Sequence, residues 1–333
     1  MAVPTNERLT YGAVGIREDL SNIIYNISPM DTPFLNGCGR GSADNTQFEW
    51  QTDELKAVAM NQQLEGDDYT STAATEPRRM SNYTQISATQ VQSSGTAEAV
   101  DFAGRKSTQA YQLAKRAKEM KRDMEYMLLQ GTVKAVGAAG VARSTGAFAT
   151  WVGTSVAGTS NIVAASTGAG ITNNGAGLTY PDGTTNSAGG GANTTTTIAL
   201  INEVAERVWN LGGTPDTILC NGTVKGTISS STVGGAVVAA PRGDIGSKDS
   251  VTAVNAVDVL VTDFGTFKVV PDRHIPATNV DFVDFDLWSV DYLRPFRTET
   301  LAKSGDSVKQ LLIAEYGLRA KNGNGRGQLK SAI

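Results

Sequence analysis

Residues 98–130 read EAVDFAGRKSTQAYQLAKRAKEMKRDMEYMLLQ, and this stretch decides the fold. Its small and apolar residues are spaced three and four apart, as on one face of an α-helix. They are Ala110, Leu113, Ala117, Met120, Met124 and Met127. No proline interrupts the stretch and Gly131 follows it, so the pattern predicts one long helix over 98–130 whose methionine face packs on a core.

The other side of this helix is charged. Lys115 and Glu119, and likewise Lys121 and Glu125, are four residues apart, a spacing at which opposite charges can pair along a helix. We therefore expect both pairs on the solvent face.

The residues before the helix, 46–96, have an extended pattern. Phe48 and Trp50 alternate with polar residues, which predicts a strand with one apolar face, and residues 83–92 form a second β-type run. A charged segment between them carries Glu65, Asp67 and Asp68, followed by Arg78 and Arg79. The pattern predicts a long hairpin with a charged tip, and a hairpin alone is marginal unless a partner covers it.

The residues after the helix divide into two parts. Residues 153–197 contain ten glycines and a single charged residue, Asp182, so they cannot form an ordinary core and are interpreted as a surface insertion. A helix over 197–211 follows. Strands are then predicted at 217–220, 257–261, 266–270, 281–285 and 309–313. The fold class is therefore α+β.

Composition excludes several classes of protein. The 333 residues include 29 Lys and Arg against 33 Asp and Glu, so the net charge of −4 argues against binding nucleic acid through the overall field. No apolar run approaches the roughly 20 residues of a membrane span, and no secretory signal is found at the start. Cys38 and Cys220 form no motif, so we expect two inert thiols in a reducing compartment.

Few residues could carry chemistry. His274 is the only histidine and lies between predicted strands, without a G-x-S-x-G motif to supply a nucleophile. The acidic tip lacks the spacing of a calcium loop. Aspartates at 281, 284, 286 and 291 are expected at strand edges or facing outward, with a carboxylate pair left open. We predict no catalytic residue, no cofactor, no metal and no enzyme.

The order of parts and six short blocks resemble one family. The blocks are Tyr25–Phe34, Glu49–Asp53, Leu64–Asp68, Gly104–Lys106 with Ala110–Lys115, Tyr292–Phe296 and Glu315–Arg319. They are similar to tailed-bacteriophage major capsid proteins of the Hong Kong 97-type shell fold, in the SU10-like branch. The similarity covers nearly the whole chain apart from the Gly/Thr-rich stretch.

The resemblance implies a division of the chain. Residues 1–45 would be the N-terminal arm and 46–96 the extended E-loop. Residues 97–135 and 296–333 would form the P-domain with its spine helix, and 198–295 the A-domain. Residues 136–197 would be a Gly/Thr-rich insertion.

The resemblance also implies a function: a virion structural protein, made in the host bacterial cytoplasm, that forms hexamers and pentamers around double-stranded DNA. The E-loop of one subunit would lie on the P-domain of the next. Expected contact residues are Phe48, Trp50, Glu65, Asp67, Asp68, Arg78, Arg79, Arg105, Lys106, Lys115 and Arg116. Expected partners are a separate scaffolding protein, a portal and a decoration protein, with no membrane. Two alternatives stay open: a bacterial nanocompartment shell of the same fold, and a hydrolase using His274.

Overall fold

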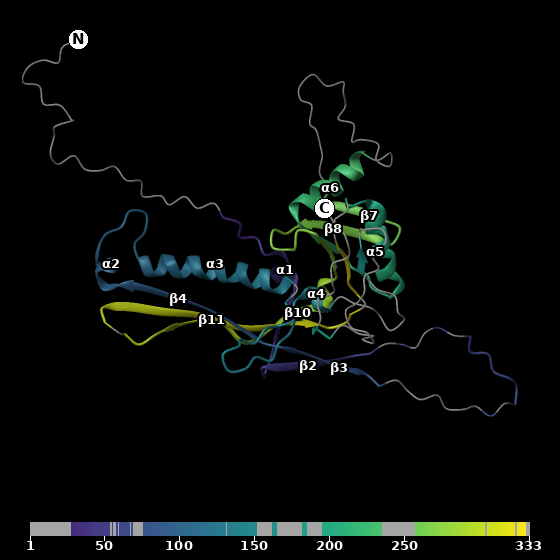
Figure 1. Ribbon diagram of the computed structural model, residues 1–333, viewed down its shortest axis with the longest axis horizontal. Coiled ribbons are helices and arrows are strands. Elements are labelled where there is room, and N and C mark those ends of the chain that lie inside the picture. The colour runs from purple at the N-terminus through teal and green to yellow at the C-terminus, as the bar shows by residue number, and fades with distance from the viewer. Residues whose placement is uncertain are drawn as a thin grey trace, which may run out of the picture.

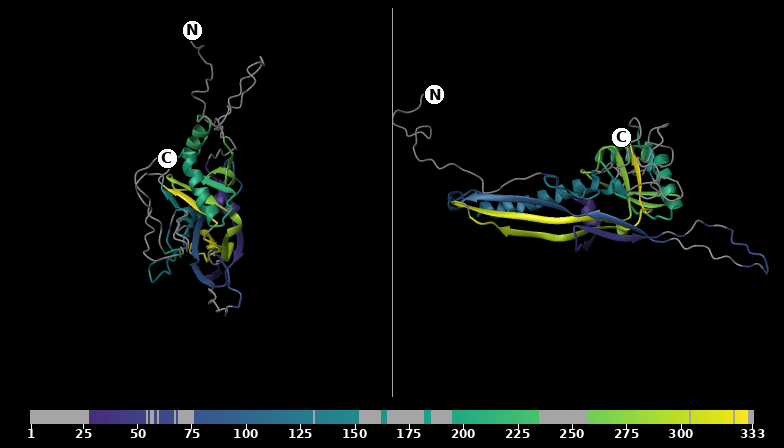
Figure 2. Two further views of the ribbon diagram at one scale, coloured as in Figure 1. Left: turned by 90° about the vertical axis from the view of Figure 1, so that its right-hand side faces the viewer. Right: turned by 60° about the horizontal axis from the view of Figure 1, so that its bottom comes forward.

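The computed structural model places most of the chain in an elongated molecule with two halves (Figures 1 and 2). One half is a long helix lying along a narrow sheet, and the other is a broader sheet covered by helices. The residues that the structure describes are 28–53, 55, 58, 60–66, 68, 76–130, 132–151, 162–164, 182–184, 195–234, 257–303, 305–323 and 325–330.

The long helix is shorter than the sequence pattern predicts. Residues 98–130 form the end of a short helix, α2 (Gly95–Ala99), then a turn, then α3 (Thr108–Leu129). Gly104 has a φ of 77° in this turn, a conformation that favours glycine. The Ser107 side chain then accepts a hydrogen bond from Ala110 N–H and starts α3 as an N-cap. The prediction of one continuous helix was therefore wrong at its N-terminal third.

The methionine face of α3 is part of the core, as predicted. Met120 and Met124 are buried, Met120 against Leu312 and Ala314, whereas Met127 is half-buried. The sheet beneath has the order β1-β10-β11-β4. Strand β10 pairs antiparallel with β11 and parallel with β1. Its strands are β1 (Gly39–Ser42), β10 (Trp288–Thr300), β11 (Ser307–Ala320) and β4 (Gln85–Ser94). Residues 39–42, within the predicted arm, therefore contribute an edge strand.

The ladder between β10 and β11 is irregular near its middle. The register shifts on both sides of Arg294. There, the buried Glu315 carboxylate accepts from Arg294 at 2.7 Å and from Arg143 at 2.6 Å. Two guanidinium groups thus share the Glu315 carboxylate at the irregularity, and their charges compensate the burial of this carboxylate.

The second half is a six-stranded sheet with the order β5-β12-β9-β6-β8-β7. The buried faces of helix α5 and of the sheet meet at Val204, Val208, Ile218 and Phe282. The elements are β5 (Ile162–Ala164), β12 (Gly327–Lys330), β9 (Asn279–Val283), β6 (Thr217–Cys220), β8 (Gly265–Pro271), β7 (Val259–Thr262), α5 (Ile198–Asn210), α6 (Gly222–Gly234) and the 3-10 turn η2 (Phe285–Leu287). The predicted helix and strands of this region are confirmed to within a few residues.

The hairpin differs from the prediction in its second strand. β2 (Gln47–Thr52) pairs with β3 (Arg78–Tyr83), not with residues 83–92. The chain passes from β3 into β4 at the buried Thr84, and β4 pairs with β11 in the four-stranded sheet. Gly317 makes this crossing possible, because a Cβ there would lie 2.4 Å from the Phe48 ring.

The predicted division of the chain into domains departs from the observed sheets at three points. β12, assigned to the same unit as the spine helix, pairs with β9 in the six-stranded sheet, and β10 begins at Trp288, eight residues before 296. Helix α4 (Phe148–Trp151) lies in the supposed insertion, yet its residues are all buried. Most of the predicted N-terminal arm, residues 1–27, and most of the Gly-rich stretch lie outside the described residues.

A buried glutamate joins the arm to the long helix. Glu125 does not pair with Lys121 as predicted, but accepts hydrogen bonds from Phe34 and Leu35 N–H, both at 2.7 Å. These residues belong to helix α1 (Pro33–Gly37), which begins at a proline. Burial, together with the neighbouring Asp272 carboxylate, raises the pKa of Glu125 to about 8.

Two of the aspartates expected on the outside are buried. Asp281 accepts a 2.6 Å hydrogen bond from Gln328, and burial raises its pKa to about 7. Asp291 is paired with Arg319 at 2.5 Å. Both lie on strands enclosed on both faces, so alternation of polar residues could not reveal their position.

Replacing Gly317 by alanine tests the crossing of the hairpin over β11. The added methyl group overlaps the Phe48 ring, and we expect a loss of about 1–3 kcal/mol in the free energy of unfolding, measured by urea titration. Gly226→Ala is the control, because nothing lies within 4 Å of that position in α6 and the change should stabilise the helix slightly. Equal effects of the two changes would contradict the account.

Glu125→Gln tests the buried carboxyl. The pKa of Glu125 is raised in the folded state, so its contribution is fully present below its ordinary value of 4.5 and is lost as pH rises toward about 8. Across that window the natural chain should lose up to roughly 1.4 kcal/mol of unfolding free energy per pH unit through this group. The variant should show a flatter profile in urea unfolding at a series of pH values. An unchanged profile would show that Glu125 titrates normally.

Candidate subunit-contact surface

The base of the β2–β3 hairpin is fixed to the body by its aromatic face. Phe48 is buried, with Arg319 stacked 5.6 Å from its ring centre. Trp50 is half-buried against Trp151, with ring centres 5.3 Å apart. The body of the same chain therefore covers the face that we expected a partner to cover, and the expected role of Phe48 and Trp50 is corrected to that of an anchor.

Asn82 holds the same base through polar contacts. Its side-chain amide donates to the Leu318 carbonyl at 2.6 Å and to Thr145 Oγ1 at 3.0 Å, while its carbonyl oxygen accepts from Gly146 N–H at 2.9 Å. Asn82 is fully buried. Two segments far apart in sequence are thus fixed to β3, which makes the base of the hairpin rigid.

A lysine closes the clamp. Lys134 Nζ donates to the Ser81 carbonyl at 2.9 Å and lies 5.8 Å from the centre of the Trp151 ring. Burial lowers the pKa of Lys134, although the Asp182 carboxylate opposes this shift. The half-buried Lys134 side chain thus joins the hairpin to the segment that follows α3.

The loop beyond this base projects away from the body (Figures 1 and 2). Four of its described residues are apolar and highly exposed: Leu55 at 99%, Val58 at 104%, Met60 at 91% and Leu64 at 75%. Each such side chain gains about 1.5–3 kcal/mol when fully buried. Apolar groups presented by a projecting loop on a rigid base are typical of a surface that a partner covers.

The expected acidic tip is partly described. Glu65 and Asp68 are exposed on the projecting loop, and Asp67 lies outside the described residues. Arg79 forms an ion pair with Glu49 across the hairpin, and Arg78 is exposed beside it. The structure therefore separates the set: the acids lie on the loop and the arginines at its base.

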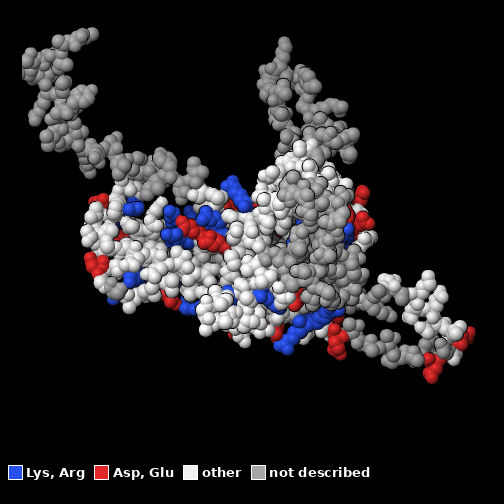
Figure 3. Space-filling view, in the orientation of Figure 1, with Lys and Arg blue, Asp and Glu red and all other residues white. Residues whose placement is uncertain are grey.

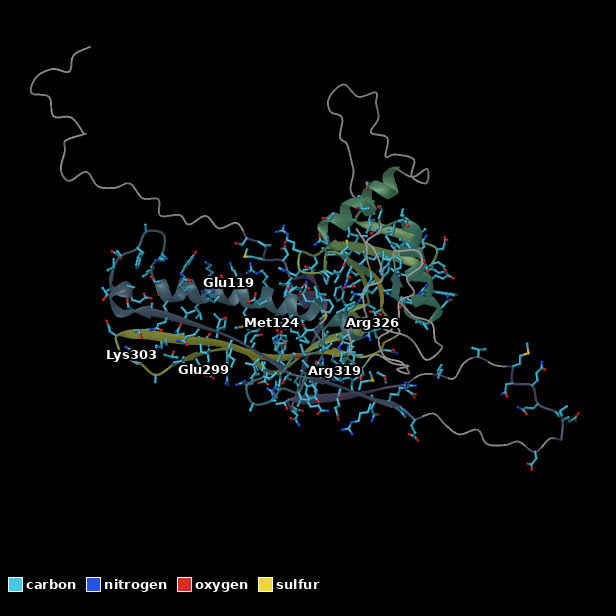
Figure 4. The ribbon with its side chains drawn as sticks, viewed as in Figure 1. Glu119, Met124, Glu299, Lys303, Arg319 and Arg326 are labelled. Atoms are coloured by element: carbon cyan, nitrogen blue, oxygen red, sulfur yellow. The ribbon has the colours of Figure 1, made fainter. Side chains whose placement is uncertain are left out.

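The expected basic residues lie toward the opposite end of the molecule, on the turn before α3 and on α3 itself (Figures 1 and 3). Arg105 stacks on Phe102 at 4.3 Å, and Lys106 is exposed. Lys115 and Arg116 approach Glu119 at 4.0 and 2.7 Å, which confirms the predicted Lys115–Glu119 pair. Figure 4 shows Glu119 on α3 and Lys303 at the end of the β10–β11 hairpin, both far from the projecting loop. The acids and the bases thus cannot meet within one chain.

The described part of the chain shows few features of a site for small-molecule chemistry. No group of three or more His, Cys, Asp or Glu that could hold a metal occurs there. His274 N–H donates to Asp272 in a loop, and no serine hydroxyl is bonded to the ring among the described contacts. Cys38 and Cys220 are free and buried, and burial raises the pKa of Cys220 to about 12. No described helix is long and apolar enough to cross a membrane.

Sequence reasoning missed the residues that fix the hairpin. Asn82, Lys134 and Thr145 are single polar residues whose partners lie up to 236 positions away, so no local pattern identifies them. The exposed Leu55, Val58, Met60 and Leu64 could have been noticed, because they are apolar residues within a charged loop.

Comparisons with known proteins show which proteins this chain is similar to. The chain is 29% identical over 352 residues to the major capsid protein of Escherichia phage Phieco32, covering 97% of this chain and 96% of that protein. Its fold is similar to the capsid of cyanophage A-1(L), with a TM-score of 0.69 at 14% identity over 95% of this chain and 97% of the other. It is also similar to the SrpI encapsulin of Synechococcus elongatus PCC 7942, with a TM-score of 0.51 at 11% identity over 93% and 92%.

Solved structures at these identities establish the fold, which is the Hong Kong 97-type shell fold. The sequence comparisons establish more. A family model described as SU10 major capsid protein matches residues 3–332, nearly the whole chain. The chain therefore belongs to the SU10 major capsid protein family and is a structural protein of a phage capsid.

Proposed function

We propose that copies of this chain assemble head to tail into rings, the hexamers and pentamers of the shell, through the projecting loop. The observation that carries the proposal is the set of four exposed apolar side chains on a loop whose base is clamped. A contact between two different surfaces of identical subunits closes into a ring when the rotation allows it. The loop of one subunit would cover the half of its neighbour that contains α3.

Charge supports the direction of this contact. The loop carries Glu65 and Asp68, and the opposite end of the molecule carries the exposed Lys106 beside Arg105. Lys115 and Arg116 are weaker candidates, because both lie beside Glu119 of their own helix. Pairs at the rim of an interface fix register and partner choice more than affinity.

The proposed content of the shell is double-stranded DNA, taken up without sequence specificity. A scaffolding protein, a portal and a decoration protein complete the proposed assembly, which would be made in the host cytoplasm. The fold alone is shared with an encapsulin, but the 29% identical relative is a phage capsid protein. We therefore propose the DNA-filled head over a protein-filled compartment, and a structural role over catalysis by His274.

Electron microscopy of the purified chain tests the shell. Concentrated protein should form closed particles of uniform size, since each subunit has a loop and a surface to receive it. Nucleic acid extracted from nuclease-treated particles of infected cells should be double-stranded DNA. A monodisperse monomer at high concentration would contradict assembly, and particles filled with an enzyme would favour the compartment.

The loop itself is tested by Met60→Ser combined with Leu64→Ser. Each substitution removes an apolar side chain that the neighbour would cover, which weakens every contact by about 1.5–3 kcal/mol per side chain. Particles should therefore disappear from sedimentation profiles while the free subunit stays folded. The matched control is Val136→Ser with Val141→Ser, two side chains exposed to 62% and 63% elsewhere on the surface. Normal particles from the Met60/Leu64 variant would exclude these side chains from the contact.

A further inference from the structure

The outward face of α3 carries a stripe of basic and tyrosine side chains. It consists of Tyr111, Lys115, Lys118, Arg122 and Tyr126, spaced four, three, four and four residues apart along one side of the helix. At 1.5 Å per residue the stripe is roughly 22 Å long. The opposite side of α3 carries the buried Met120 and Met124, so the stripe faces away from the sheet.

Two cations of this stripe, Lys118 and Arg122, are less neutralised than several cations elsewhere in the described residues. Elsewhere Arg79, Arg207 and Arg297 each pair with a glutamate, and Lys225 pairs with Asp258. Within the described residues, neither Lys118 nor Arg122 has a carboxylate within ion-pair distance. The nearby Glu119 is engaged by Arg116 at 2.7 Å and only approached by Lys115 at 4.0 Å. A positive stripe therefore lies on a chain whose net charge is −4.

The stripe also forms one wall of a groove. Ser28, Pro29 and Met30 line it together with Lys115, Lys118 and Arg122, and the groove has a volume of about 220 Å³. Glu119, which pairs with Arg116, is the one carboxylate in this lining. Aromatic hydroxyl groups border it, since Tyr111 lines it and Tyr126, exposed to 50%, follows one turn after Arg122. Lys, Arg and Tyr side chains are the donors that proteins use on the phosphates of duplex DNA.

We infer that the Tyr111–Tyr126 stripe binds the sugar-phosphate backbone of the enclosed DNA, so that α3 forms part of the inner wall of the shell. This inference rests on the proposed DNA-filled shell. Duplex DNA carries one negative charge per roughly 1.7 Å of axis, so a stripe of this length faces many phosphates. Contacts from these donors to phosphates do not distinguish one base sequence from another, as the packaging of a whole genome requires.

The test is a binding titration with the full-length, unassembled chain and a fluorescent duplex of mixed sequence, about 30 base pairs long, followed by anisotropy at several salt concentrations. Lys118→Gln with Arg122→Gln should weaken binding about tenfold or more near 0.1 M salt and lower the slope of log affinity against log salt by about 2. Arg297→Gln with Lys303→Gln removes the same charge from the β10–β11 hairpin and should leave both quantities nearly unchanged. Thermal unfolding confirms that both variants are folded.

Three outcomes would overturn the inference: no binding by the natural chain, equal losses in the two variants, or tighter binding of polyglutamate than of the duplex at equal charge. The last would assign the stripe to an acidic protein partner. Electron microscopy of the same preparations separates this inference from the proposed function. Shells that form normally from both variants, with duplex binding unaffected in both, reject the stripe and leave the shell in place, whereas a chain that forms no shells rejects the shell itself.

Discussion

The amide side chain of Asn82 is the interaction on which the projecting loop depends. It bonds to β11 through the Leu318 carbonyl and to the 145–146 segment through Thr145 and Gly146. A buried amide that lost one of these partners would leave polar groups unsatisfied, at a cost of about 1–3 kcal/mol each. The direction in which the loop leaves the body is therefore set by a small, fully satisfied polar network, with Phe48 and Trp50 packed beside it.

The junction at Glu125 does the same for the arm. Two backbone N–H groups of α1 meet a carboxylate that is also close to Asp272 on the loop after β8. The arm, the long helix and the six-stranded half of the molecule thus meet at one buried acid. Because all three segments share it, its protonation affects their packing together and not one at a time.

Much of the fold could be predicted from periodicity. The methionine face of α3, helix α5 and the strands near 217–220 and 265–271 follow local patterns and were predicted. The switch at Thr84, the entry of β12 into the distant sheet and the burial of Asp281 depend on pairings between residues far apart. For the contact surface, the acidic loop and the basic helix were identified by charge. Their positions at opposite ends of the molecule could not be predicted, because a sequence pattern does not show where two segments lie in space.

The irregular ladder at Arg294 has a mechanical consequence. Strands β10 and β11 form a long antiparallel ribbon between the two halves. A regular ribbon of this length would resist bending equally along its whole length. Two register shifts on either side of Arg294 interrupt this ladder, and such irregularities bend a strand locally. Glu315, held by Arg143 and Arg294, lies at the same place. In the proposed rings of five and of six, subunits would adopt slightly different curvatures, and a bend at this irregularity would allow this while both ends keep their packing.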